Sequence, residues 1–302
     1  MVLPVIIIGV AVLKVVLPAS IAVVFSSRRD MKKMRDDLEK MHDDLKKMQD
    51  CLKKQYAWNQ GIPPEIRPTR EQREKAEPML EDPSKSFYHF AVAGHAGTGK
   101  SSLVNAFRGY KDKDKGAAKV GINETTMDIK RYPDRSSIFK NFVWYDIPGA
   151  NRLWLFIFDF IIVCWKDRIM EIDIQTLTSC EKMEVPIPTF LVRTNSQTHI
   201  HCLKLSEEIT KEEAKEKLIK ETSETVKKTL QACNYNDPNK KAYIIDRFIL
   251  GKVVSDLTEK FRSKKDIITD DDIREMAENV EGAIDEGDLL IDLLRTAKER
   301  RR

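Results

Sequence analysis

Cysteine is scarce in this chain of 302 residues, and no Cys-x-x-Cys pair occurs. The five cysteines are far apart in the sequence, at Cys51, Cys164, Cys180, Cys202 and Cys233. This spacing argues against a disulfide framework and a zinc site, and it suits a reducing compartment. An excess of one charge is also missing, because the net charge is only +4 although 33% of the residues are charged. Acidic and basic residues are interleaved, so no nucleic-acid-binding surface is indicated.

The chain begins with a long apolar run, Val2 to Phe25, in which Lys14 is the only charge. As a helix this run extends roughly 36 Å, which is enough to cross a bilayer core of about 30 Å. The basic pair Arg28-Arg29 follows the run and predicts that its C-terminal side faces the cytosol. We therefore expect residues 1–29 to anchor the protein in a membrane. A signal peptide and a buried core helix are the alternatives, and Lys14, Pro4 and Pro18 weaken the membrane span.

Residues 30–58 carry a heptad repeat of apolar side chains. Its a positions are Met31, Leu38, Leu45 and Leu52, and its d positions are Met34, Met41 and Met48. This period predicts a short coiled-coil helix through which two copies of the chain associate, and a single amphipathic helix is the alternative. The segment Gly61-Ile62-Pro63-Pro64 breaks the helix. We expect residues 59–86 to form a linker and residues 87–302 to form the main domain.

The strongest motif is Gly94-His95-Ala96-Gly97-Thr98-Gly99-Lys100-Ser101, which fits the phosphate-binding loop pattern Gly-x-x-x-x-Gly-Lys-Ser. Glycines let the backbone curl until several N–H groups point at one phosphate. An apolar strand (Phe87–Ala93) and a helix (Ser101–Arg108) are expected on either side, with the helix N-terminus facing the phosphates. A chance glycine-rich turn is the alternative. The predicted phosphate-binding residues are Gly94, Gly97, Thr98, Gly99, Lys100, Ser101 and Ser102.

A second motif, Asp146-Ile147-Pro148-Gly149, follows a strongly apolar stretch that is expected to be a strand. At this place after a phosphate loop, Asp146 is expected to hold Mg²⁺ through a water molecule, and the amide of Gly149 to meet the γ-phosphate. A Pro-Gly turn without function is the alternative. Between the two motifs, the hydroxyl of Thr126 is preferred over that of Thr125 as a further group that reaches Mg²⁺. The predicted metal set is therefore Ser101, Thr126 and Asp146.

Strand and helix patterns alternate along the domain, which predicts an α/β fold with a mostly parallel sheet flanked by helices. The further strand candidates are Met127–Tyr132, Phe139–Tyr145, Phe156–Val163, Thr189–Val192 and Ala242–Ile245. Helices are expected over 206–232, 270–280 and 285–300, and Thr210 with Glu213 can form a capping box inside the first turns of the first of these. A His-x-His pair, His199 and His201, is expected on a strand. It is interpreted as a polar strand exit in preference to a metal site.

The chain resembles the immunity-related GTPases, the interferon-inducible group among the dynamin-like large GTPases. The resemblance rests on residues 94–109, on Glu124-Thr125-Thr126-Met127, on 144–149 and on Phe190-Leu191-Val192-Arg193-Thr194, and more loosely on 284–290. It implies a Ras-like P-loop domain that binds GTP with Mg²⁺. It also implies nucleotide-driven dimerisation of this domain and work at intracellular membranes, with the domain facing the cytosol.

The guanine-binding motif of this family, Thr/Ser-Lys-x-Asp, appears here as Thr194-Asn195-Ser196-Gln197. The resemblance places Thr194, Asn195 and Gln197 at the base. The neutral Gln197 cannot accept two hydrogen bonds from guanine as a carboxylate does, and Asn195 has too short a stem to cover the ring. We therefore expect only a small preference for GTP over ATP, and an ATP-binding protein is an alternative.

The catalytic part of the site is also reduced. Ala150 follows Gly149 where a glutamine would orient the attacking water, so fast unaided hydrolysis is not implied and no catalytic residue is assigned. The segment from Asn151 to Leu155 is too short for the second switch helix of Ras-like domains if the next strand starts at Phe156. Two interpretations remain, namely a slow membrane-associated GTPase that self-assembles, and a nucleotide-binding membrane assembly module with little or no hydrolysis.

Overall fold

The computed structural model describes residues 35–43, 45, 87–120, 130–134, 136, 138–139, 141–147, 155–183, 185–262 and 268–300. The chain divides into two units, Met1–Glu65 and Ile66–Arg302. In the first unit, residues 35–43 are helical, with Leu38 and Met41 exposed. The predicted anchor (1–29), most of the predicted coiled coil (30–58) and the predicted linker (59–86) lie outside the described residues. Within the described ranges, no helix has both the length and the apolar character that a membrane span requires.

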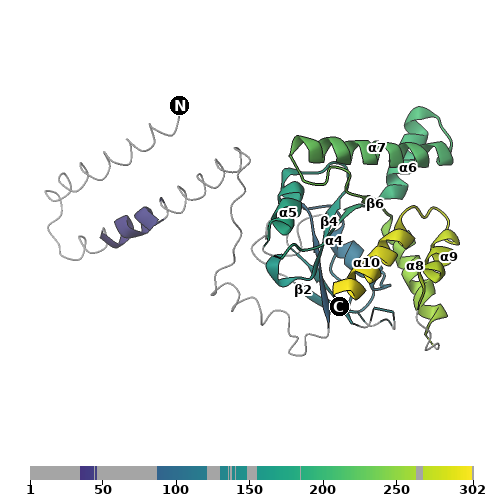
Figure 1. Ribbon diagram of the computed structural model, residues 1–302, viewed down its shortest axis with the longest axis horizontal. Helices are drawn as coiled ribbons and strands as arrows, with labels where there is room; N and C mark the ends of the chain where they lie inside the picture. Colours follow the sequence, from purple (N-terminus) through teal and green to yellow (C-terminus); the bar gives the residue numbers. More distant parts are fainter. Residues whose placement is uncertain are drawn as a thin grey trace. The chain divides into compact units, whose positions relative to one another are not determined.

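The second unit is built on a six-stranded sheet with the order β2-β3-β1-β4-β5-β6. Figure 1 shows this sheet with helices around it. Its strands are β1 (Tyr88–Ala93), β2 (Lys130–Pro133), β3 (Phe142–Asp146), β4 (Phe160–Trp165), β5 (Thr189–Arg193) and β6 (Ala242–Ile244). In the described part of this sheet, only the edge strand β2 is antiparallel to its neighbour, and the other strand pairs are parallel. The predicted α/β fold with a mostly parallel sheet is therefore confirmed.

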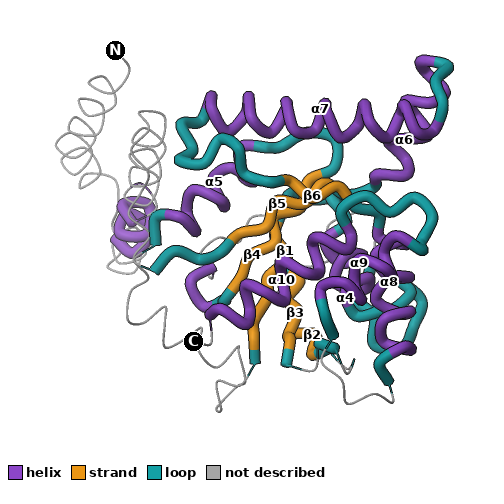
Figure 2. The backbone as a smooth tube through the Cα atoms, turned by 45° about the vertical axis from the view of Figure 1, so that its right-hand side comes forward, coloured by secondary structure: helices purple, strands orange, loops and turns teal. Residues whose placement is uncertain are grey.

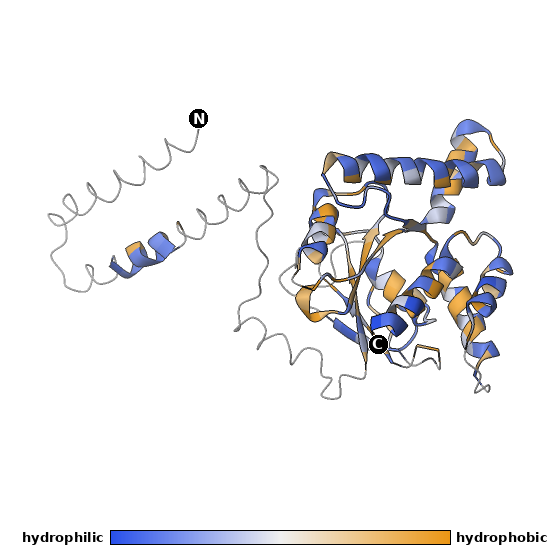
Figure 3. Cartoon of the chain, in the orientation of Figure 1, coloured by the Kyte–Doolittle hydropathy of each residue, from blue (hydrophilic) through white to orange (hydrophobic). Residues whose placement is uncertain are grey.

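Helices cover both faces of this sheet, as the tube drawing shows (Figure 2). The residues of β1 alternate between the faces, because Phe90 and Val92 belong to one apolar cluster and Ala91 and Ala93 to the other. The first cluster includes residues of α4 (Lys100–Phe107), α8 (Arg247–Lys260), α9 (Asp270–Glu278) and α10 (Glu286–Arg300). The second includes residues of α5 (Glu171–Glu181) and α7 (Lys211–Ala232). In Figure 3 the strands are mostly hydrophobic, whereas α7 is mostly hydrophilic.

The expected long helix over 206–232 is wrong in its start, because the chain forms two helices there. α6 (Ser196–Glu207) ends at Glu208, whose φ of 57° lies in the left-handed region and breaks the helical path. α7 then begins after Thr210, whose side chain and Glu213 form a capping box at the helix N-cap. The capping box is thus confirmed, but as a helix start. His199 and His201 lie in α6, so their expected strand is also wrong.

Two further boundaries differ from the sequence predictions. β3 begins at Phe142 and not at Phe139, since residues 138 and 139 form a bend. The strand expected from Phe156 begins at Phe160, and the apolar residues before it form a short 3₁₀ helix, Leu155–Ile157. Phe156 and Ile157 belong to this helix, so two apolar residues were mistaken for part of the strand. The segment after Asp146 is therefore longer than expected.

Candidate functional site

The Gly94–Gly99 loop connects β1 to α4, so the strand–loop–helix arrangement predicted from the motif is confirmed. Three of its glycines have positive φ angles, 138° at Gly94, 82° at Gly97 and 86° at Gly99. A Cβ atom at Gly94 would lie 2.2 Å from the carbonyl oxygen of Cys164 in β4. No larger residue fits there, and the loop is consequently held against the centre of the sheet.

Inside the loop, one carbonyl organises two side chains. The carbonyl oxygen of His95 accepts hydrogen bonds from Thr98 Oγ1 at 2.9 Å and from Lys100 Nζ at 3.1 Å. Thr98 and Lys100 are both buried, and Lys100 is only 8% exposed. Among the residues that the structure describes, no carboxylate forms an ion pair with Lys100. Within the described part of the chain, the charge of this buried ammonium group is therefore not paired with a carboxylate.

Ser101 and Asp146, two of the three predicted metal ligands, are in contact. Ser101 Oγ donates a hydrogen bond to Asp146 Oδ2 at 2.5 Å, and Asp146 is buried at the end of β3. A hydroxyl and a carboxylate are hard oxygen ligands of the kind Mg²⁺ prefers, together with phosphate oxygens and water. The described residues contain no group of three His, Cys, Asp or Glu side chains that could hold a metal by themselves. Thr126 and Gly149 lie outside the described residues.

The predicted base-binding residues follow β5, at the same edge of the sheet. Thr194 Oγ1 donates to the carbonyl oxygen of Thr98 at 2.8 Å, so this threonine supports the phosphate loop. Asn195 has a φ of 62° and precedes the first residue of α6. Gln197 Nε2 donates to the carbonyl oxygen of Gly282 at 3.0 Å. The structure therefore brings Thr194 to the loop and engages the side-chain amide of Gln197 in a contact with the turn before α10.

His95 and Asp173 form a contact that the sequence analysis missed. His95 Nδ1 lies 3.2 Å from Asp173 Oδ2, which also accepts a hydrogen bond from the backbone N–H of Met170 at 2.9 Å. Asp173 is fully buried, and this burial raises the pKa of its carboxyl group. The pair ties the phosphate loop to the start of α5. The only signal in the sequence was the acidic residue in the first turn of a helix that had not been predicted.

A second missed group connects α4 to the loop that follows it. Asn105 binds both backbone groups of Ala118, accepting from its N–H at 2.6 Å and donating to its carbonyl at 3.0 Å. Asn105 Nδ2 also donates to Asp112 Oδ1 at 3.1 Å. Arg247 Nη1, at the start of α8, donates to Ser102 Oγ at 2.9 Å and to Asp112 Oδ2. Residues distant in sequence thus fix the loop that follows α4.

His199 and His201 lie in α6, and within the described part of the chain no third His, Cys, Asp or Glu joins them in a metal-binding group. His199 Nε2 lies 3.7 Å from Asp167 Oδ1. Burial lowers the pKa of His199, and the nearby positive charge of Arg193 lowers it further. His199 is half-buried in a helix, so the interpretation of the pair as a polar strand exit is wrong.

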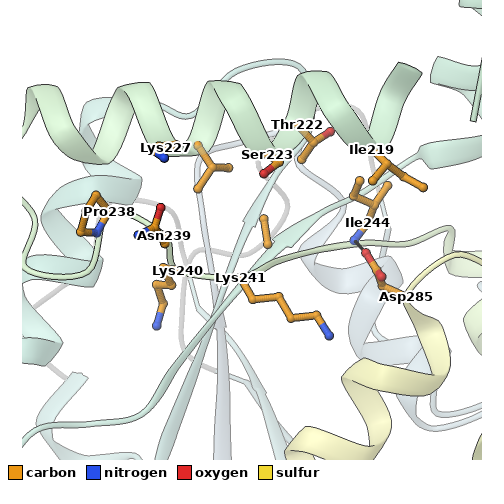
Figure 4. A pocket seen from close by; sticks show the side chains of 12 residues that line it. Ile219, Thr222, Ser223, Lys227, Pro238, Asn239, Lys240, Lys241, Ile244 and Asp285 are labelled. Carbon is orange, nitrogen blue, oxygen red and sulfur yellow. Dashed lines mark hydrogen bonds between the residues drawn. The ribbon is translucent and has the colours of Figure 1, made fainter. Parts of the chain in front are cut away.

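A pocket of about 230 Å³ lies between α7 and the segment that leads into β6. Figure 4 shows Lys227, Lys240 and Lys241 around it, with their amino groups pointing in different directions. Lys241 forms an ion pair with Asp288 at 2.7 Å, and burial lowers the pKa of Lys240. Because the three amino groups do not converge, this arrangement does not form a binding site for an anion.

A family model described as interferon-inducible GTPase (IIGP) matches residues 71–240, which is more than half of the chain. Interferon-inducible GTPase 1 of Mus musculus is 30% identical over 132 residues, covering 40% of this chain and 31% of that protein. Interferon-inducible GTPase 5 of Rattus norvegicus is 48% identical over 60 residues, covering 20% of this chain and 12% of that protein. The chain thus spans less than a third of the length of these two relatives.

Among solved structures, the chain is similar to that of Toc33 from Arabidopsis thaliana in complex with GDP and Mg²⁺. The TM-score is 0.35 and the sequence identity is 19%. The match covers 59% of this chain and 78% of that one.

Proposed function

Because the chain belongs to the interferon-inducible GTPase family, we propose that its Gly94–Ser101 loop binds GTP together with Mg²⁺. The observation that carries this proposal is the buried Lys100. Its ammonium group hydrogen-bonds to the carbonyl of His95, and no carboxylate of the described residues neutralises it. Burial of an uncompensated charge is costly, so an anionic ligand in the curl of the loop stabilises this arrangement.

In this proposal, different residues around the loop bind the phosphates and the metal ion. Lys100 and the N-terminus of α4 meet the phosphates, assisted by the N–H groups of the loop. The hydroxyl of Ser101 and the carboxylate of Asp146 fit Mg²⁺, which when bound neutralises charge that develops on the phosphates. We include Thr126 and Gly149 in the site from the sequence alone.

Hydrolysis in this proposal is slow. Ala150 has no side chain that can orient a water molecule, and no other residue of the chain is assigned that role. Lys100 stabilises the transferred phosphoryl group. Contact between the nucleotide-binding domains (residues 87–302, the G domain) of two copies supplies the remaining groups. The proposed function is therefore that of a membrane-associated GTPase whose self-assembly depends on the nucleotide that is bound. Residues 1–29 are its proposed anchor, and residues 30–58 are a second proposed site of self-association.

A second candidate function is a membrane assembly module that binds nucleotide but hydrolyses little or none. The contact between Gln197 and Gly282 favours this alternative, because it engages the residue that would distinguish guanine from adenine. The same observation also favours ATP binding as a further alternative function. Steady-state phosphate release from GTP and from ATP, measured over a range of protein concentrations, distinguishes these cases. A rate per molecule that rises with concentration supports the GTPase, and an undetectable rate supports the module.

The nucleotide-binding proposal is tested by Lys100→Ala. Removal of a charge-assisted contact to the phosphates is expected to weaken binding of a labelled GTP analogue on the order of a hundredfold. Lys228→Ala removes an exposed lysine of α7 and serves as the matched control. Equilibrium binding in the presence of Mg²⁺ is the measurement. Equal affinity of Lys100→Ala and the unchanged protein would remove the phosphate site from the proposal.

A further inference from the structure

Asp173, in the first turn of α5, contacts the phosphate loop although it belongs to no phosphate-binding motif. Its Oδ2 atom lies 3.2 Å from His95 Nδ1 and also accepts a hydrogen bond from the backbone N–H of Met170 at 2.9 Å. Asp173 is fully buried, whereas the His95 side chain is partly exposed. One carboxylate oxygen therefore connects the start of α5 to the second residue of the loop.

Helix capping alone does not explain why Asp173 is buried. Glu213 in α7 and Asp272 in α9 are the corresponding acidic residues, and each accepts the N–H of its N-cap residue. Hydrogen bonds from these N-cap residues lower the pKa of both carboxyl groups, whereas burial raises the pKa of Asp173. A buried carboxylate is costly unless a partner stabilises it. In the part of the chain that the structure describes, the ionisable side chain at ion-pair distance from Asp173 is His95.

His95 links this carboxylate to the lysine of the loop. Its carbonyl oxygen accepts hydrogen bonds from Lys100 Nζ at 3.1 Å and from Thr98 Oγ1 at 2.9 Å. The backbone before His95 is fixed by Gly94, where a Cβ atom would lie only 2.2 Å from the carbonyl oxygen of Cys164. The side chain of His95 is held by α5. These two constraints together determine the direction of the His95 carbonyl group.

The direction of this carbonyl affects the position of Lys100. The ammonium group of a lysine sits on a flexible four-carbon stem, so its position depends on the contacts of its nitrogen. Lys100 is buried in the loop and donates to the His95 carbonyl. A donor that is already in place binds a charged ligand more tightly than one that the ligand must order. A fixed His95 carbonyl therefore favours binding of phosphates at Lys100.

We propose that Asp173 is a positioning residue of the phosphate site, which acts through His95 to hold the Lys100 ammonium group where the phosphates bind. The inference rests on the proposed function, because it assumes that Lys100 binds phosphates. It deepens that function by assigning part of the affinity to a residue of α5. Because the effect passes through the ammonium group, it should disappear when Lys100 is removed.

Asp173→Ala in the full chain tests this role. It removes the acceptor that holds His95, and affinity for a labelled GTP analogue with Mg²⁺ is expected to fall about tenfold. Asp272→Ala is the matched control, because it removes the corresponding acidic residue of α9. Both variants lose a hydrogen bond to an N-cap N–H and should lose a similar amount of stability in thermal unfolding. Only Asp173→Ala should lose affinity for GTP.

Two conservative changes separate positioning from a general effect on the fold. Asp173→Asn keeps an oxygen that can accept from both His95 and Met170, so it should recover most of the lost affinity. His95→Leu removes the donor from the loop side and should weaken GTP binding to a similar extent as Asp173→Ala. This variant keeps the proposal testable even if Asp173→Ala does not fold.

The double variant Asp173→Ala with Lys100→Ala tests whether the effect passes through the lysine. It should bind GTP no more weakly than Lys100→Ala alone, because the group that Asp173 positions is already missing. Losses that multiply in the double variant would overturn the proposed route. Unchanged GTP affinity in folded Asp173→Ala or His95→Leu would overturn the positioning role while leaving the phosphate site intact. If the unchanged protein does not bind the GTP analogue, the proposed function fails and the positioning role fails with it.

Discussion

Gly94 is the residue whose identity the fold determines most strictly. It combines a φ of 138° with a Cβ position only 2.2 Å from the Cys164 carbonyl oxygen. Gly116 has a comparable φ of 93°, but a Cβ atom there meets nothing within 4 Å. A comparison of substitutions at the two glycines therefore separates the cost of backbone strain from the cost of a steric clash.

We predict that Gly94→Ala destabilises the domain by on the order of 3 kcal/mol or more, because a backbone atom of β4 must move in addition to the strain. Gly116→Ala is expected to cost about 1 kcal/mol from strain alone. Urea unfolding of both variants gives the two free energies of unfolding. The result that would contradict this prediction is an equal loss of stability at the two positions.

Glu286, the first residue of α10, is a buried carboxylate that contacts the residue before α8. Its oxygens accept hydrogen bonds from the backbone N–H groups of Asp246 at 2.8 Å and Ile284 at 2.6 Å. Burial nevertheless raises the pKa of Glu286 from 4.5 to about 7. The folded protein thus holds this proton more tightly than the unfolded chain. The stability that it contributes is fully present below about pH 4.5 and is lost as the pH rises to about 7.

We predict that Glu286→Gln removes this pH dependence. One pKa unit corresponds to about 1.4 kcal/mol, so the stability difference between variant and unchanged protein should shift by on the order of 2–3 kcal/mol between pH 4.5 and pH 8, in favour of the variant at the higher pH. The amide has its own constant cost, since its NH₂ group faces one N–H donor. Denaturant unfolding at both pH values is the measurement, and a constant difference would show that Glu286 keeps its ordinary pKa.

At the scale of elements, local capping signals were informative and helix composition was not. Thr210 with Glu213 was recognised from the sequence, and it caps α7 as expected for that pair. α5 was missed because Thr176, Thr178 and Ser179 are poor helix formers, yet each hydroxyl donates to the carbonyl four residues earlier. In such a helix, packing against the sheet outweighs propensity, and packing cannot be inferred from the local sequence.

The α8 helix was missed for a similar reason. Gly251 lies in its middle, and glycine is unfavourable in a helix interior. In the structure, a Cβ atom on Gly251 would lie 3.7 Å from Cα of Ala106, so the small residue allows α8 to approach α4 closely. Glycine is therefore favourable at this position because of a contact between segments that are far apart in the sequence.

We predict that Thr210→Ala lowers the free energy of unfolding by about 1 kcal/mol, because the N–H of Glu213 loses the acceptor at 3.2 Å. Thr225→Ala, an exposed position inside α7, should be neutral or slightly stabilising, since alanine is the better helix former. Thermal or urea unfolding compares the two variants. If both substitutions have the same effect, the capping box contributes nothing measurable to stability.

At the scale of the whole molecule, the loops after parallel strands decide which predicted site residues meet. The phosphate-loop motif and Asp146 were predictable, because each follows a strongly apolar strand and such strands end at one edge of the sheet. Arg247 and Asp173 carry no motif, and only the tertiary fold brings them to the loop. Their contribution depends on the order of strands in the sheet and on how α5 and α8 pack, neither of which a local pattern determines.

The apolar run at the start of the chain gives the last prediction. Val2 to Phe25 is long enough to cross a bilayer, and Arg28-Arg29 follows it. We predict that the full chain stays in the membrane pellet after a carbonate wash, whereas a truncated chain that begins at Asp30 is recovered in the supernatant. Both proteins should bind GTP with the same affinity, because the phosphate loop lies in the second unit of the chain.

Two controls make this result specific. The first control replaces both Arg28 and Arg29 with Ser, which removes the basic flank. A protease-accessibility assay on sealed vesicles then reports whether the G domain still faces one side of the membrane. The same assay on the unchanged chain should show a G domain that is accessible from the cytosolic side. If carbonate releases the full chain, the run does not span the membrane. The protein is then either attached peripherally or buries the run in its own core. GTP binding in the same samples is a separate test of the phosphate site.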